Sequence, residues 1–63
     1  MNDAQFIAQR LLNNMQMLQE TFDLLISSTP TGEIRNKIAD ANIHFGAAQA
    51  LLSESSVQLG KAS

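Results

Sequence analysis

The chain is divided at Ser27-Ser28-Thr29-Pro30-Thr31-Gly32, a stretch that holds its only proline and the first of its three glycines. Proline disfavours helix in the residue before it, so the helical spacing on either side stops here. The second helix starts either at Thr29 and Pro30, as cap and first helical residue, or after Thr31. Because so short a connection joins two segments of similar length, the sequence predicts an all-α antiparallel hairpin with its turn at about 28–32.

Apolar residues before the turn recur at steps of three and four, which is the spacing of a helix over about 3–27. They form one stripe: Ile7, Leu11, Met15, Leu18, Phe22 and Leu25. Phe6, Leu12 and Ile26 lie beside this stripe and widen it. A stripe of this width can contact more than one neighbouring helix.

After the turn, a more regular stripe predicts a second helix over about 33–59. Its members alternate steps of four and three, a 3.5-residue repeat that favours supercoiling: Ile34, Ile38, Ala41, Phe45, Ala48, Leu52, Ser55 and Leu59. Gly60 is expected to cap the end of this helix. Gly46 and Ala50 form a small pair four residues apart, which predicts a close helix crossing.

A single hairpin cannot cover both stripes, and residues 1–63 amount to one small domain that buries little surface. We therefore expect two hairpins to pair into a four-helix bundle, a homodimer or a higher even oligomer. The residues expected to carry this self-association are Leu11, Met15, Leu18, Phe22, Leu25, Ile38, Ala41, Phe45, Ala48 and Leu52.

The composition excludes several classes of protein. There is no cysteine, which removes disulfide frameworks and thiolate zinc sites. Hydrophobic residues, at 44%, are too many for a disordered tail, whereas charged residues, at 16%, fall below the roughly 25% of ordinary domains. The start of the chain has no signal-peptide pattern, and no apolar run could span a bilayer, so we expect a cytoplasmic protein that does not enter a membrane.

Catalytic and metal-binding patterns are weak. His44 follows Asp40 by four residues, which resembles the rear half of a catalytic triad, but no nucleophile stands in a suitable context. The alternating charges at Glu33, Lys37, Asp40 and His44 are typical of a solvated helix surface. With one histidine and scattered carboxylates, the sequence predicts no metal site, no cofactor and no enzymatic activity.

Nucleic-acid binding is the alternative function, because paired helical hairpins can bind RNA. The expected architecture resembles that of the ROP-type bundle, although no sequence motif is shared and no residue is carried over. The candidate contacts are Arg10, Arg35 and Lys37, which dimer symmetry would duplicate. A net charge of −2 opposes this function.

Amides are unusually frequent on the polar surface. Four of them follow one side of the first helix, at Gln5, Gln9, Asn13 and Gln16. Amides cost less to bury against a partner than charges do, so these residues form a candidate partner face. The leading hypothesis is thus a non-enzymatic, homo-oligomeric regulator or adaptor that binds another protein through the outside of its bundle. A structural subunit of a phage or secretion assembly is a further alternative.

Overall fold

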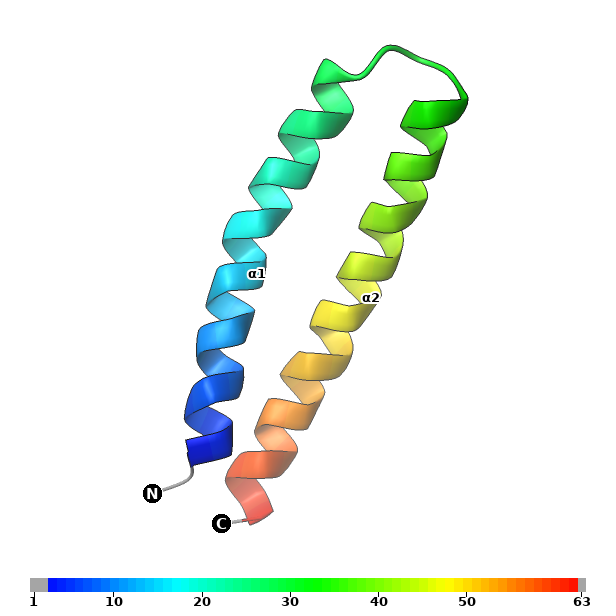
Figure 1. Cartoon of the computed structure of the whole chain (residues 1–63). Helices are drawn as coiled ribbons and strands as arrows, with labels where there is room; N and C mark the ends of the chain where they lie inside the picture. Colours follow the sequence, from blue (N-terminus) through cyan, green and yellow to red (C-terminus); the bar gives the residue numbers. More distant parts are fainter. Residues whose placement is uncertain (1–2, 63) are drawn as a thin grey trace.

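The computed structural model describes residues 3–62, and these residues form two helices. Helix α1 (Asp3–Ser28) and helix α2 (Glu33–Ala62) run antiparallel side by side, so that both ends of the chain lie at the same end of the molecule (Figure 1). The backbone extends over 47 × 15 × 9 Å along its three principal axes. The predicted all-α hairpin is confirmed.

The turn is closed by hydrogen bonds at both of its ends. The Thr29 hydroxyl donates to the carbonyl of Leu25 at 2.6 Å, and the Thr29 amide donates to the carbonyl of Ile26 at 3.2 Å. Thr29 therefore closes α1 and does not cap α2, contrary to one of the two predicted starts. Gly32 has a φ of +156°, which L residues rarely adopt, and its carbonyl accepts the first hydrogen bond of α2, from Asn36.

Helix α2 continues beyond the residue expected to cap it. Gly60 is helical, and the helix ends at Ala62, so the predicted cap at Gly60 is wrong. The physical reason is packing at the open end of the hairpin. The side chain of Gln5 lies directly against Gly60, in space that a β-carbon would occupy. Glycine here permits contact between the two helices instead of ending the second one.

The helices meet along a seam that repeats every seven residues. The residues of α1 that face α2 are buried or half-buried, at steps of three and four: Gln5, Ala8, Leu12, Met15, Gln19, Phe22 and Ile26. The matching residues of α2 are Ile38, Asn42, Phe45, Gln49, Leu52, Ser56 and Leu59. Such a repeat keeps one line of side chains against the neighbouring helix along its whole length.

The seam gives the single chain very little core. Within residues 3–61, Ala8 and Met15 are the only hydrophobic residues classed as buried, and Ser56 is fully buried. At the middle of the seam the rings of Phe22 and Phe45 pack with their centroids 5.2 Å apart, tilted by 50°. Most of the remaining apolar surface of both helices is still in contact with water.

Candidate self-association surface

Five of the ten residues predicted to self-associate lie outside the seam, on one side of the hairpin. They are Leu11, Leu18 and Leu25 of α1, and Ala41 and Ala48 of α2. Each stands one position before a seam residue, as Leu18 stands before Gln19. Because the helices are antiparallel, the same position of the repeat lies on the same side of both. We call these five residues the leucine–alanine face.

The other five predicted residues, Met15, Phe22, Ile38, Phe45 and Leu52, lie in the seam and are covered at least in part by the second helix. Each predicted apolar stripe therefore consists of two lines of side chains. One line closes the hairpin, and the other remains exposed beside it.

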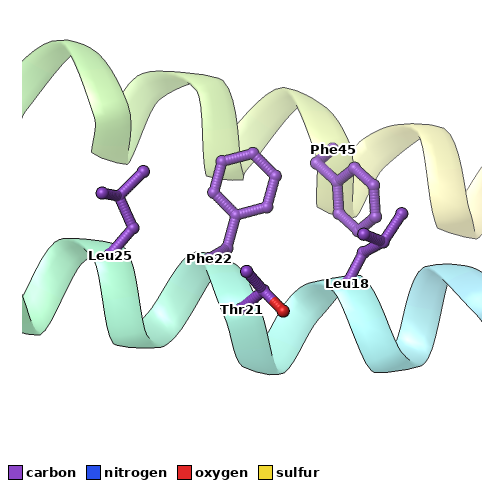
Figure 2. Close-up of a pocket in the computed structure, with 5 residues that line it drawn as sticks. All are labelled: Leu18, Thr21, Phe22, Leu25 and Phe45. Carbon is purple, nitrogen blue, oxygen red and sulfur yellow. The ribbon is translucent and has the colours of Figure 1, made fainter.

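The leucines of this face are only half covered within the chain. The exposed fractions are 48% for Leu11, 51% for Leu18 and 49% for Leu25. Figure 2 shows Leu18 and Leu25 on α1 on either side of Phe22, with Phe45 reaching in from α2. Together with Thr21 they line a shallow open pocket of about 200 Å³. The face thus continues into the aromatic pair at the centre of the seam.

Charge is absent from the position of the repeat that holds the leucine–alanine face and is concentrated on the outside of the hairpin. The eight residues of 3–61 at the position of the leucine–alanine face, which adds Ala4, Ile34 and Ser55, include no charged side chain. Six of the ten charged residues of the chain share another position of the repeat, which points away from the seam: Asp3, Arg10, Glu33, Asp40, Glu54 and Lys61. Depletion of charge from an apolar patch is typical of the centre of a protein interface.

The total exposed surface is large for the mass of the chain. It amounts to 4868 Å², whereas a compact monomer of 6.9 kDa is expected to expose about 4,000 Å². The excess is close to the roughly 800 Å² that each partner buries in a standard protein interface. Pairing through one face would bring the exposed surface to that of an ordinary small protein.

The predicted amide face lies on the opposite side of α1, and the hairpin already uses part of it. Gln9 donates a hydrogen bond of 2.8 Å to the hydroxyl of the fully buried Ser56, and Gln5 lies against Gly60. Asn13 and Gln16 are exposed. Two of the four amides are thus available to a partner, and the other two also join the helices of the hairpin.

The polar residues of the seam do not belong to either apolar stripe and are not predicted by apolar periodicity. Gln19 donates to the amide oxygen of Asn42 at 2.8 Å across the interface, one turn from the aromatic pair. Gln49 is half-buried at the same position of the repeat as Asn42. A search for polar residues at 3.5-residue spacing would have found them, because Asn42, Gln49 and Ser56 follow one another at seven-residue steps.

The structure does not bring the candidate nucleic-acid contacts together. Arg10 is in the half of α1 near the open end, whereas Arg35 and Lys37 are in the first turns of α2, next to the connection (Figure 1). Arg35 donates to the hydroxyl of Thr31 at 3.2 Å, and Lys37 pairs with Glu33 at 3.5 Å. One hairpin therefore presents no joint basic surface built from these three residues.

His44 and Asp40 are both exposed on α2, where neither enters the seam. In the described part of the chain, no three histidine or carboxylate side chains are grouped closely enough to bind a metal ion. Neither α1 nor α2 has a segment that is both long and apolar enough to cross a bilayer.

Within the hairpin Gly46 does not lie at a close helix crossing, and a crossing at Gly46 and Ala50 between two copies stays a prediction. Nothing lies within 4 Å of the place where its β-carbon would be. The glycine stands one position after the seam residue Phe45, on the side opposite the leucine–alanine face. Its absent side chain therefore leaves open space beside α2.

Gly46→Ala is accordingly expected to stabilise the protein. Alanine favours an exposed helix interior over glycine by about 1 kcal/mol, and no neighbour of the chain obstructs the new methyl group. In a domain of this size such a gain raises Tm by roughly 4–8 °C. Thermal unfolding followed by circular dichroism at equal chain concentrations tests this prediction. A lowered Tm would show that another molecule occupies the space beside Gly46.

Comparison with known proteins adds no relative: no protein-family model matches the chain, and neither a curated protein nor a solved structure shows significant similarity to it.

Proposed function

We propose that this chain is a non-enzymatic adaptor that dimerises through the leucine–alanine face and binds another protein through the outside of the resulting four-helix bundle. One observation carries the proposal: an uncharged apolar face runs along both helices beside a seam that buries very little. Exposed apolar patches of this kind mark sites of protein interaction.

A second copy of the chain is the partner that best fits this face. Burying a leucine side chain completely is favourable by about 1.5–3 kcal/mol. The three leucines of the leucine–alanine face are about half buried within the hairpin, so each has gained about half of this free energy. A symmetric dimer contains six of these leucines, three from each copy, and the remaining half of the burial free energy is gained at each of them. The seam residues Phe22 and Phe45, which line the open pocket, are covered by the same step.

The outer surface remains for a second protein. Asn13 and Gln16 are exposed on the side of α1 that faces away from the dimer contact, and each dimer carries two copies of them. Amides desolvate at lower cost than charges and can exchange hydrogen bonds with water for hydrogen bonds with a partner. An adaptor needs such a surface to be separate from the contact that holds its own subunits together.

Native mass spectrometry of the protein isolated gently from its host tests both parts of the proposal. The expected result is a dimer of twice 6.9 kDa with additional mass that is protein. The double variant Asn13→Ala/Gln16→Ala is expected to lose that mass, whereas Asn36→Ala/Gln58→Ala, which removes one Asn and one Gln from exposed positions of α2, is expected to keep it. A bare monomer would overturn the proposal, and retained nucleic acid would replace it with the alternative function.

A further inference from the structure

The two helices contribute unequal rows to the leucine–alanine face: the middle of the row on α1 consists of leucines and that on α2 of alanines, with Ala4, Ile34 and Ser55 at the ends of the rows. From this inequality we infer that the second copy binds with its α2 over α1 of the first copy, and its α1 over α2, so that both turns lie at the same end of the bundle. The inference rests on the proposed dimer and specifies its symmetry.

Two symmetric arrangements can bury this face. If the two-fold axis runs along the helices, each α1 lies opposite α2 of the other copy, and the two turns meet at one end. If the axis runs across the helices, α1 lies opposite α1 and α2 opposite α2, and the turns are at opposite ends. Neighbouring helices are antiparallel in both arrangements, so helix direction does not distinguish between them.

The positions of the residues along the long axis of the hairpin, called their heights below, favour the two-fold axis that runs along the helices. The hydrogen bonds from Gln9 to Ser56 and from Gln19 to Asn42 show that residues whose numbers add to about 64 lie at the same height. Leu18 thus lies between the heights of Ala41 and Ala48. A two-fold axis along the bundle leaves heights unchanged, so each Leu18 meets the gap between two alanines of the second copy.

Side-chain volume supports the same arrangement. Large residues packed against small ones allow the layers of a bundle to interdigitate without voids. The spacing of two helix axes varies between about 8 and 10 Å with the side chains in contact. The other arrangement would place leucines against leucines on one side and alanines against alanines on the other. Two hairpins would then have to pack at unequal spacing on their two sides.

The rim of the face provides a second argument. On α1 the exposed residues next to the face are uncharged and include Asn14 and Thr21, whereas on α2 they include Lys37 and His44. An axis along the helices places the rim of α2 opposite the uncharged rim of α1. An axis across the helices would instead bring the two rims that carry Lys37 and His44 onto the same edge of the bundle.

This symmetry has a consequence for an adaptor. Both turns would form one end of the bundle, and all four chain ends would form the other. The two outer surfaces with Asn13 and Gln16 would then face opposite sides but point along the axis in the same direction. Two bound proteins would be held on opposite sides of the bundle with the same polarity.

A spin label at the turn measures the arrangement directly. The chain has no cysteine, so Thr31→Cys creates one labelling site for each copy, at an exposed position. Pulsed dipolar spectroscopy is expected to give a distance between labels below about 25 Å, because two helices side by side are roughly 20–24 Å wide. Turns at opposite ends would give a distance close to the 47 Å length of the hairpin.

Gln16→Cys is the control, because it lies near the middle of α1, so that its label reports the width of the bundle and gives a distance well below 47 Å in either arrangement. A short distance at both sites supports the inference. A long distance at Thr31 with a short one at Gln16 overturns the inference and leaves the dimer intact. No dipolar signal at either site means that the dimer does not form, in which case the proposed function fails as well.

Discussion

Leu18→Glu is expected to convert the proposed dimer into monomers at micromolar concentration. Leu18 is 51% exposed in the single hairpin, so a glutamate there keeps its hydration and costs the isolated chain little. In the dimer the carboxylate would lose that hydration against an uncharged face, and symmetry doubles the penalty. We expect a loss of about 4 kcal/mol or more, which corresponds to a roughly thousandfold rise in the Kd for self-association. Sedimentation equilibrium over a range of concentrations measures it.

Leu24→Glu is the matched control for this experiment. It makes the same substitution on the same helix and brings the same change in net charge, but Leu24 is 68% exposed on the outward side of α1. The dimer is expected to persist in this variant with nearly unchanged affinity. If both variants weakened the dimer equally, the leucine–alanine face would not be the contact. If neither did, self-association through this face would be refuted.

The hairpin itself could be predicted from the sequence because each step depends on local chemistry. The proline and glycine of the turn end one helix and allow the next to begin, and Gly32 adopts the backbone conformation that favours glycine. The apolar residues on either side repeat with helical spacing. These signals lie within a few residues of the features that they determine, so no knowledge of the partner helix is required.

The rotation of each helix about its own axis could not be predicted in the same way. Apolar periodicity places Leu18 and Phe22 on one stripe, but it does not decide which of them faces the other helix. The structure selects Phe22, because the line that contains it also holds Gln19, whose amide bonds with Asn42 across the seam. Polar residues in a seam constrain register in this way, and a search for apolar stripes does not detect them.

The same limitation applies to the candidate surface. The ten residues predicted to self-associate belong to two apolar stripes, and the structure divides them equally between the seam and the leucine–alanine face. That division depends on how the two helices pack, which is a property of the pair. Gln5 and Gln9 illustrate the point on the opposite side, since their spacing predicts a partner face whereas their contacts lie within the hairpin.

Phe22→Ala is expected to destabilise the fold, because it removes one ring of the aromatic pair at the middle of the seam. Truncating a fully buried phenylalanine costs about 3–5 kcal/mol, and Phe22 is half-buried with its ring 5.2 Å from that of Phe45, so we expect about 2 kcal/mol. In a domain of this size that loss lowers Tm by roughly 8–16 °C. Thermal unfolding monitored by far-ultraviolet circular dichroism measures it, at one fixed chain concentration because the proposed dimerisation would contribute to Tm.

Phe6→Ala separates the loss of this contact from the general effect of removing an aromatic ring. Phe6 is 63% exposed on the same helix, so its truncation is expected to change stability by less than about 0.5 kcal/mol. Similar Tm values for the two variants would contradict a central role for the aromatic pair. Because Phe22 also lines the pocket beside Leu18 and Leu25, its truncation is expected to weaken the dimer as well, whereas Phe6→Ala leaves that contact intact. A fall in both stability and self-association for Phe22→Ala alone would show that the centre of the seam supports the hairpin and its pairing together.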